Sequence, residues 1–263
     1  MSSFLTESNI DSLIIQTGHS REVVRAVLLK VENAVTTISS NFEVKENGVV
    51  KTFKVTRKGV GQITTHAGLF YQYDFEIDDN WRKYSVLFKG KVDENWYPVL
   101  KNPDKILIRI DSGCETGQVF NDKTCDCKEQ LHLAMSSIEA HGEGFIINIP
   151  YQDGRGQGLV FKLATLVLQD ELGLDTVESA RLVAQSHEID IRTYSGVIAI
   201  LKHFGLKNGL EIDLATNNPK KTKIFGENNF TLSSMKSVVV SPTEYTKRHL
   251  KAKQDKLNHI DLV

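Results

Sequence analysis

The sequence predicts a mixed α/β fold with an N-terminal helical extension, an antiparallel β region and then alternating helices and strands. Two observations predict it. Short, partly alternating apolar runs punctuated by polar turns fill the chain from Val49 to Asp111. From Gln130 onward helical and strand periodicities alternate, and 40% hydrophobic residues in a chain of 263 are enough to bury a full core.

The first 45 residues are predicted to be helical. Ser20 is a suitable N-cap for a helix from Arg21 to Ile38, in which apolar side chains repeat at helical spacing. This apolar stripe needs a partner surface, either the rest of the chain or another molecule, and we assign it no chemical role.

After the β region, each predicted element has its own signal. A strand over Ile106–Ile110 leads directly to the cysteines, and Asp175 and Glu178 have the spacing of a capping box at a helix start. Glycines close two of the helices. The predicted helices are 130–141, 159–172, 197–204 and 247–256, and the predicted strands are 145–149 and 212–215.

Charge and hydropathy exclude several classes of function. The formal net charge is -1, so no overall basic field indicates DNA or RNA binding, and an anionic ligand must be held by local cations and backbone N–H groups. No segment approaches the roughly 20 apolar residues that span a membrane, and residues 1–15 lack a secretory signal pattern. We therefore expect a cytoplasmic protein that binds neither nucleic acid nor membrane.

All three cysteines lie close together, at Cys114, Cys125 and Cys127. An odd, clustered set in a reducing compartment favours a metal site over disulfides. Three thiolates suit Zn²⁺ and leave its fourth position for water, which is typical of catalytic zinc. Three free thiols, or a structural site completed by a histidine, are the alternatives. A zinc nucleobase deaminase is disfavoured because its His-x-Glu and Pro-Cys-x-x-Cys elements are absent.

Two loops have the composition of anion-binding turns. Residues 152–158 read Gln-Asp-Gly-Arg-Gly-Gln-Gly between a predicted strand and a helix, so the backbone can approach a ligand closely and Arg155 adds a fixed charge. Residues 216–221 read Thr-Asn-Asn-Pro-Lys-Lys, also follow a strand, and offer phosphates a hydroxyl and two lysines. Taken alone, an ordinary turn without a ligand explains each loop.

Taken together and in order, these motifs resemble those of the GTP cyclohydrolase II family, whose members catalyse the first step of riboflavin synthesis. The matching segments are Cys114-Glu115-Thr116-Gly117, Cys125-Asp126-Cys127, Gln152-Asp153-Gly154-Arg155, Leu168-Gln169-Asp170, Asp175-Thr176-Val177-Glu178, Asp190-x-Arg192 and the 216–221 loop, with a weaker match in the tail from His249 to His259. The resemblance covers roughly residues 64–262. We therefore divide the chain into an N-terminal helical extension with a connecting strand, residues 1–60, and a GTP cyclohydrolase II-like catalytic domain, residues 61–263.

The resemblance implies zinc-dependent hydrolysis of GTP at C8 of the guanine ring, with release of formate and pyrophosphate. It assigns Zn²⁺ to Cys114, Cys125 and Cys127, and Mg²⁺ to the triphosphate. The matching nucleotide-binding positions are Arg109, Gln130, Asp153, Gly154, Arg155, Thr176, Thr216 and Lys221. Family members are commonly homodimers, so we expect a homodimer.

Two further residues acquire catalytic roles from the resemblance. Arg192 matches the residue proposed to engage the α-phosphate as nucleophile, and Asp190 matches the acidic residue proposed as proton acceptor. From the residues alone, an exposed ion pair that contributes little to stability is the simpler explanation.

The sequence departs from the family pattern around the first cysteine and at one helix. Asp111 replaces a histidine, Gly113 a glutamate, Gln118 an aspartate and Asp153 a longer carboxylate, and we expect these changes to bear on base or ribose recognition.

Leu166 stands where the family has an active-site tyrosine. Leucine has no hydroxyl to orient water or pass a proton, so we hypothesise that formate release is impaired and a formylated pyrimidine product accumulates. The alternative is that Leu166 is core, with Leu159 and Leu163. Two other functions stay open, namely hydrolysis of a different purine or pyrimidine nucleotide, and nucleotide binding without catalysis.

Overall fold

The computed structural model describes residues 3–78, 83–184 and 188–263. Its centre is an eight-stranded sheet in the order β1-β2-β3-β4-β8-β7-β9-β10, and β5 (Lys91–Val92) pairs with β6 (Pro98–Val99) in a second, small sheet. The strands of the main sheet are β1 (Ile38–Glu46), β2 (Val49–Thr65), β3 (Gly68–Ile77), β4 (Lys83–Lys89), β7 (Lys105–Ser112), β8 (Gly144–Ile149), β9 (Glu211–Ala215) and β10 (Thr231–Lys236). The predicted mixed α/β class is confirmed.

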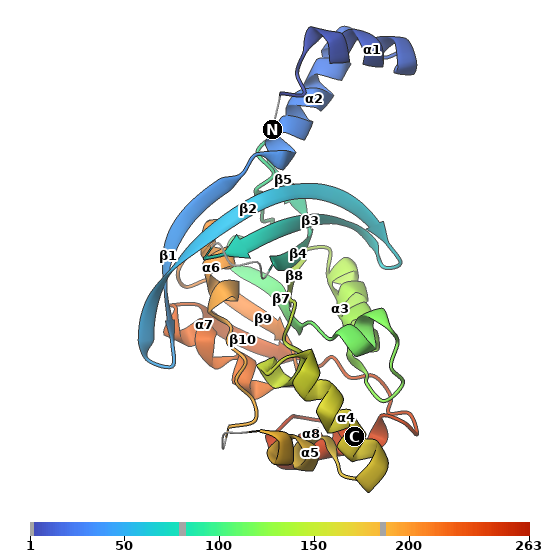
Figure 1. Ribbon diagram of the computed structural model, residues 1–263. Helices are drawn as coiled ribbons and strands as arrows, with labels where there is room; N and C mark the ends of the chain where they lie inside the picture. Colours follow the sequence, from blue (N-terminus) through green and yellow to red (C-terminus); the bar gives the residue numbers. More distant parts are fainter. Residues whose placement is uncertain (1–2, 79–82, 185–187) are drawn as a thin grey trace.

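The sheet changes character halfway across. From β1 through β2, β3 and β4 to β8 the neighbours are antiparallel, whereas β8, β7, β9 and β10 run parallel. The antiparallel strands curl over one face of the molecule (Figure 1). The predicted strand at 106–110 is confirmed as β7, and its nearly continuous burial is typical of a parallel strand that is covered on both faces.

Helices cover both faces of the sheet and one of its edges (Figure 1). α6 (Ser195–His203) packs inside the curl of β1 and β2 near α7 (Lys223–Glu227), and α3 (Cys127–His141) packs on β7 and β8 from the other face. α4 (Leu159–Leu172), α5 (Thr176–Val183) and α8 (Lys247–Leu257) form a third group. Three short helices complete the loops: η1 (Glu115–Val119), η2 (Asp153–Gly156) and η3 (Pro219–Lys221).

The carboxyl ends of the parallel strands meet at one edge of the sheet. Ser112 of β7 pairs with Ile149 of β8, and Ile108 of β7 pairs with Leu214 of β9. Cys114 follows β7, the 152–158 loop follows β8 and the 216–221 loop follows β9. Open α/β sheets bind ligands at this edge, so the topology gathers motifs that lie far apart in the sequence.

The N-terminal prediction is confirmed at the start of the second helix and wrong at its end. Ser20 caps α2 (Arg21–Val35) by accepting a hydrogen bond from the Val23 N–H, and α1 (Glu7–Thr17) precedes it. Residues 38–45, which are predicted to be helical, lie instead in β1 (Ile38–Glu46). Pairing with β2 places Phe42 and Val44 against the core, so tertiary burial outweighs the helical pattern.

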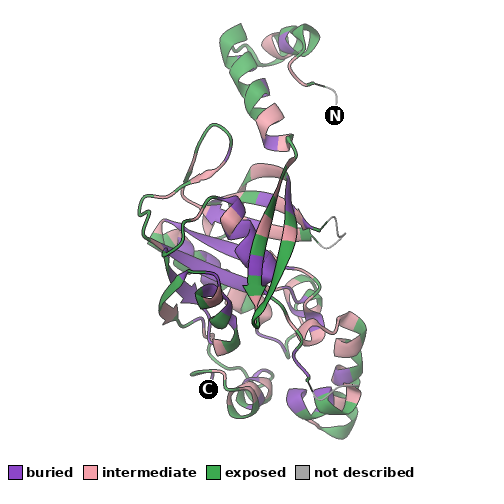
Figure 2. Cartoon of the chain, turned by 90° about the vertical axis from the view of Figure 1, so that its left-hand side faces the viewer, coloured by how far each residue is buried: buried purple, intermediate pink, exposed green. Residues whose placement is uncertain are grey.

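The α1–α2 hairpin has a small apolar cluster of its own around Ile10, Val24 and Leu28. It projects from the body and is mostly exposed, in contrast to the buried strands at the centre (Figure 2). β1 and β2 belong to the main sheet, and the division of the chain at residue 60 stays a prediction.

Several local predictions are confirmed closely. α4 has the predicted bounds and ends at left-handed Gly173, and the Asp175–Glu178 capping box is formed at α5. Pro219 takes the first position of η3. Among the described residues, no helix is both long and apolar enough to cross a membrane.

Candidate active site

The three cysteines converge although they come from two parts of the chain. Cys114 follows β7, whereas Cys125 and Cys127 lie just before and at the start of α3. Their sulfur atoms lie within 4.8 Å of one another, and the Cys114 and Cys125 sulfurs are 3.6 Å apart. Tetrahedral zinc with Zn–S bonds of about 2.3 Å places sulfurs about 3.8 Å apart, whereas a disulfide needs about 2.05 Å. The spacing therefore fits one metal ion.

The surroundings of the sulfurs also fit a metal. A Cβ on Gly117 would come within 2.9 Å of the Cys125 sulfur and 3.2 Å of the Cys114 sulfur, so glycine keeps this space open. Among the residues that the structure describes, no histidine or carboxylate joins the group, which argues for three protein ligands rather than a closed four-ligand site.

The thiols titrate as one unit. Hydrogen bonds from Cys125 and Cys127, followed by the charge of Lys162, hold the pKa of Cys114 well below its usual range. The bond to Cys114 raises the pKa of Cys125 to about 11, and the pKa of Cys127 is also raised. The cluster and Lys162 thus favour the thiolate form at Cys114, and metal binding would displace the protons of the other thiols.

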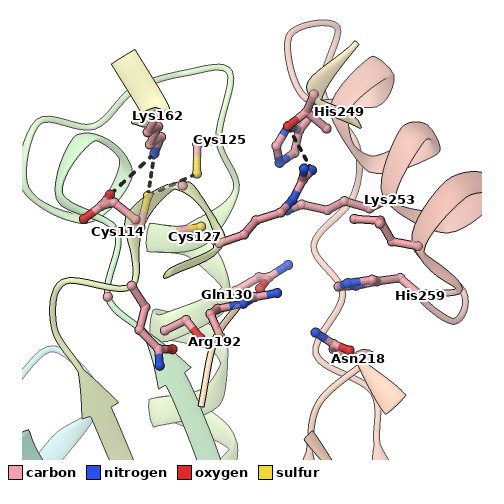
Figure 3. Close-up of a pocket in the computed structure, with 18 of the residues that line it drawn as sticks. Cys114, Cys125, Cys127, Gln130, Lys162, Arg192, Asn218, His249, Lys253 and His259 are labelled. Atoms are coloured by element: carbon pink, nitrogen blue, oxygen red, sulfur yellow. Dashed lines mark hydrogen bonds and ion pairs between the residues drawn. The ribbon is translucent and has the colours of Figure 1, made fainter. Parts of the chain in front are cut away.

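The cysteines line a cleft that contains nearly all of the predicted site residues (Figure 3). Arg192 lines it, together with every predicted nucleotide-binding residue: Arg109, Gln130, Asp153, Gly154, Arg155, Thr176, Thr216 and Lys221. Asp190 is the exception, because it reaches the cleft only through its contact with Arg192.

Arg192 and Asp190 form a two-bond ion pair. The Arg192 Nε donates to Asp190 Oδ1 at 2.8 Å and its Nη2 donates to Oδ2 at 2.7 Å. The side chains are only 15% and 6% exposed, so the pair is buried rather than the exposed pair that the residues alone suggested. Burial alone would raise the pKa of Asp190, but the bonds and charge of Arg192 hold it below its ordinary value, so the carboxylate is ionised.

Two other basic side chains in the cleft, Lys221 and Arg155, have lowered pKa values. Burial, together with Arg109 and Arg192, places the pKa of Lys221 well below its ordinary value, and its Nζ donates to the Ile110 carbonyl at 2.8 Å. Burial and Arg192 lower the pKa of Arg155 to about 10. Neighbouring cations that destabilise one another in this way are suited to an anionic ligand.

The loop after β8 has a backbone that few residues tolerate. Gly154 and Arg155 both have left-handed φ, at 57° and 61°, which is uncommon for arginine. This turn lets the Arg155 carbonyl accept from the Ile191 N–H at 3.1 Å while its guanidinium donates to the Thr176 hydroxyl at 3.2 Å. The strained turn thus links the loop to the segment that carries Arg192.

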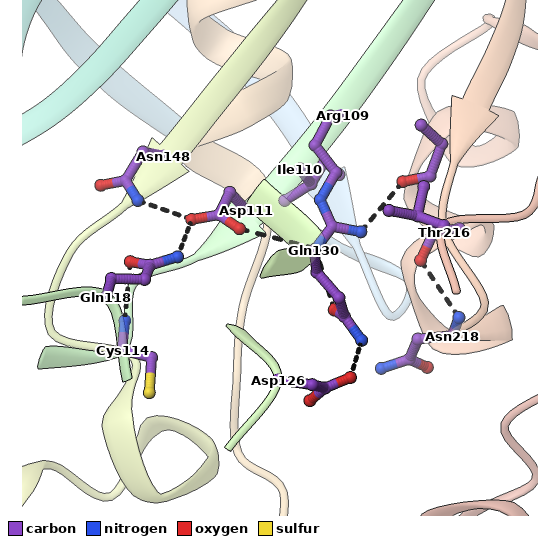
Figure 4. Close-up of polar contacts among 12 residues, drawn as sticks. Arg109, Ile110, Asp111, Cys114, Gln118, Asp126, Gln130, Asn148, Thr216 and Asn218 are labelled. Carbon is purple, nitrogen blue, oxygen red and sulfur yellow. Dashed lines mark hydrogen bonds and ion pairs between the residues drawn. The ribbon is translucent and has the colours of Figure 1, made fainter. Parts of the chain in front are cut away.

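Two departures from the family pattern form one network (Figure 4). The Gln118 amide donates to Asp111 Oδ2 at 2.8 Å, while its carbonyl accepts from the Cys114 N–H at 3.2 Å. Asn148 also donates to Asp111 at 2.8 Å, and Arg109 lies 3.5 Å from it. Asp111 and Gln118 therefore hold the loop of the first cysteine. From the sequence we expected these residues to affect base or ribose recognition, not to position a cysteine.

Gly113 is required by the same loop. A Cβ there would lie 2.9 Å from both the Ile149 carbonyl oxygen and the Pro150 Cα, so the glutamate of the family pattern would not fit this backbone.

α4 turns its polar side toward the cleft. Lys162, Thr165 and Gln169 line the cleft with Leu166, whereas Leu163 is 48% exposed. Leu166 therefore lies at the site rather than in a core with Leu163. Lys162, whose Nζ is 2.9 Å from the Cys114 sulfur, was missed from the sequence. The sequence does contain a signal for it, since Lys162, Thr165 and Gln169 stand at i, i+3 and i+7 among apolar neighbours and so mark one face of the helix.

Comparison with known proteins identifies the family of the chain. The family model described as GTP cyclohydrolase II matches residues 56–233. The chain belongs to the GTP cyclohydrolase II family. The GTP cyclohydrolase-2 of Picrophilus torridus is 30% identical over 199 residues, which cover 76% of this chain and 95% of that relative. Membership in this hydrolase family, expected from the motifs, is confirmed.

Other relatives are longer. The riboflavin biosynthesis protein RibBA of Phocaeicola vulgatus is 33% identical over 213 residues, which cover 80% of this chain and 48% of that relative. The chain thus spans about half the length of the first curated relatives it matches. A crystal structure of RibBX, a two-domain 3,4-dihydroxy-2-butanone 4-phosphate synthase from A. baumannii, overlaps with a TM-score of 0.36 at 14% identity over 88% of this chain and 49% of that one. That overlap is too low to bear on the fold.

Proposed function

We propose that this GTP cyclohydrolase II family member hydrolyses GTP at C8 of the guanine ring and releases pyrophosphate, giving a ribosylaminopyrimidinone 5′-phosphate for riboflavin biosynthesis. One observation carries the proposal: three clustered thiols and the buried Arg192–Asp190 pair meet at one cationic cleft. Zn²⁺ held by Cys114, Cys125 and Cys127 would supply Lewis acidity and activated water at neutral pH. The triphosphate would enter with Mg²⁺, as polyphosphates generally do.

The chain's own residues would bind and orient the nucleotide. Arg155 and Lys221 are basic side chains whose pKa values are lowered by burial and by neighbouring cations, and they would contact phosphate oxygens. Arg192 would engage the α-phosphate, since the ion pair with Asp190 fixes its guanidinium at the cleft. Asp190, ionised beside it, would accept the guanidinium proton as Arg192 attacks the α-phosphorus and pyrophosphate leaves, and water would then cleave the P–N bond to free Arg192.

We further propose that the formyl group is retained in the product. Leu166 lines the cleft and offers no group that could pass a proton to the amide that remains after ring opening. Ring opening would then proceed, whereas the second hydrolysis that frees formate would be slow.

The experiment is an incubation of the zinc-loaded protein with GTP, with the product read by mass and formate and pyrophosphate assayed separately. Pyrophosphate together with a formylated product is the expected result. One formate per GTP would contradict formyl retention alone. No change of GTP, in a protein shown to contain zinc, would refute the proposed activity, and loss of the reaction in Cys127→Ser should accompany loss of zinc.

A different nucleotide substrate is the second candidate. The loop beside the metal ligands is held by Asp111 and Gln118, two residues that differ from the family pattern. Contact between this loop and the base would select a different base. A panel of purine and pyrimidine nucleoside triphosphates, followed by ultraviolet absorbance, separates the candidates. Change with another nucleotide but not GTP supports this one, and binding without change supports a non-catalytic nucleotide-binding protein.

A further inference from the structure

The C-terminal segment forms a wall of the cleft that the proposed function leaves unused. His249 and Lys253 of α8 line the cleft, as do His259 and Leu262 in the tail that follows. Figure 3 shows His249, Lys253 and His259 on the opposite side of the cleft from the cysteines, pointing inward.

The tail is fastened to the loop after β9. The Ile260 N–H donates to the Asn217 carbonyl at 3.0 Å, and the Asn217 side-chain amide donates back to the Ile260 carbonyl at 2.9 Å. Gln254 of α8 accepts from the Leu262 N–H at 2.8 Å, and Leu262 is 2% exposed. The tail is therefore held beside the loop that carries Thr216 and Lys221.

Cations surround His259 in this position. After burial, the charges of Lys253, Arg192 and Lys221 lower its pKa to about 3, with Asp190 acting in the opposite direction, so the ring is neutral. Asp190 is already bound to Arg192, and Lys253 lies 3.6 Å from Asp126. Three basic side chains thus lie around a neutral imidazole and share two carboxylates, Asp190 and Asp126. An anionic ligand would complete this arrangement.

We propose that Lys253 and His259 bind the phosphates of the nucleotide, which makes residues 247–263 part of the substrate site. The Lys253 ammonium supplies charge, and the neutral His259 ring supplies an N–H donor. The inference rests on the proposed function to the extent that the ligand is a nucleotide. The inference itself requires only a polyphosphate site that depends on the side chains of Lys253 and His259, whether or not GTP is hydrolysed there.

The test compares two lysines of the same helix. Lys253→Met and Lys251→Met remove the same charge from α8, but Lys251 is exposed and does not line the cleft. Binding of inorganic tripolyphosphate and of guanosine to the full-length, zinc-loaded protein is measured by calorimetry, with zinc content determined for each variant. We expect Lys253→Met to weaken tripolyphosphate binding about tenfold or more. Guanosine affinity and zinc content should stay at the wild-type level, as should every property of Lys251→Met.

Lys253→Met also breaks the ion pair of Lys253 with Asp126, which lies between two metal-ligand candidates, so a second variant is needed that leaves this pair intact. His259→Gln keeps an N–H donor with a different reach and removes no charge, and we expect a smaller loss that is again confined to tripolyphosphate. Absence of tripolyphosphate binding in the wild type, equal losses in the two lysine variants, or loss of zinc and guanosine affinity together with tripolyphosphate would overturn the inference. A protein that binds tripolyphosphate through Lys253 but leaves GTP unchanged would refute the proposed activity and leave this inference standing.

Discussion

Gln118 connects a buried carboxylate to the backbone of the first metal-ligand candidate. Its side chain bonds to Asp111 and to the Cys114 N–H, and Asp111 is 2% exposed. In Gln118→Ala both groups lose a partner, so we expect a loss of about 1–3 kcal/mol in the free energy of unfolding. Because the Cys114 loop is also loosened, zinc affinity should fall roughly tenfold.

Chemical denaturation and competition with a metal chelator measure these two effects. Gln62→Ala is the control, since Gln62 is an exposed glutamine of β2. Unchanged zinc affinity in Gln118→Ala would show that the Asp111–Gln118 network supports the fold without positioning Cys114.

Leu166→Tyr should restore a hydroxyl at the cleft. General acid–base catalysis contributes about 10²-fold or more, so formate release per GTP should rise by roughly that factor while pyrophosphate release changes little. Leu163→Tyr, on the same helix but 48% exposed, is the matched control. Equal formate release from Leu166→Tyr and the wild type would remove Leu166 as the cause of formyl retention.

Residue-scale prediction succeeded where chemistry leaves a dense local signal. Cys114, Cys125 and Cys127 lie within 14 positions of one another and were found as a cluster, as the converging sulfurs confirm. Lys162 has no such neighbour in the sequence, and only the helix face it shares with Thr165 and Gln169 marks it. Contacts across the fold, such as Gln118 with Asp111, depend on backbone geometry that the residue types do not reveal.

At the scale of elements, α6 carries a histidine into the core. His203 is 6% exposed and packs against Phe75 and Tyr97, with ring centroids 5.3 and 5.9 Å away. Burial, and then the charge of Arg57, lowers its pKa from 6.5 to about 4. The unfolded chain therefore binds this proton at higher pH than the folded one. Its contribution to stability is fully present above pH 6.5 and is lost as the pH falls toward 4.

Because of His203, we expect the free energy of unfolding to fall by about 2 kcal/mol between pH 7.5 and pH 5. Urea unfolding of the wild type and of His203→Phe at both pH values measures it, because the variant should lose less stability on acidification by about that amount. His19→Phe, in the exposed turn between α1 and α2, should follow the wild type. Parallel pH dependence of the wild type and His203→Phe would show that His203 is not the group responsible.

Element prediction depended on whether local signals agreed with burial. α4 was bounded correctly because its apolar run ends at a glycine that adopts the left-handed conformation. β1 was mistaken for helix because Ile38 continues the helical spacing of α2, whereas the partner that decides its conformation, β2, pairs through a register that no local pattern specifies.

At the scale of the whole molecule, the site is a product of strand order. The parallel arrangement of β8, β7 and β9 brings three loops to one edge, and α8 closes the cleft from the far end of the chain. The sequence predicted the motifs on those loops but not the order of the strands, because parallel pairing is fixed by long-range packing rather than by local periodicity.

The division at residue 60 can be tested by two truncations. Removing residues 1–35 deletes the exposed α1–α2 hairpin, with loss of the bond from Trp96 Nε1 to the Lys30 carbonyl and of the Arg57 contact with the Asn33 carbonyl. We expect a single cooperative thermal transition lowered by roughly 2–6 °C. Removing residues 1–60 also deletes β1 and most of β2, including Val44 and Val55, which are 1% and 0% exposed.

The longer truncation exposes the edge of β3 that pairs with β2 and the face of α6 that β1 and β2 cover, and each buried apolar side chain that is lost costs about 2 kcal/mol. β1 and the deleted part of β2 pack five apolar side chains on the core, Phe42, Val44, Phe53, Val55 and Val60, and their loss sums to roughly 10 kcal/mol. That sum is comparable to the stability of a typical domain, about 5–15 kcal/mol, so this variant should show no cooperative transition. Scanning calorimetry measures the unfolding transition of each truncated protein, and the zinc content of each is determined in parallel. If the chain from residue 61 unfolds cooperatively and retains zinc, β1 and β2 belong to an extension, and the catalytic unit begins where the sequence placed it.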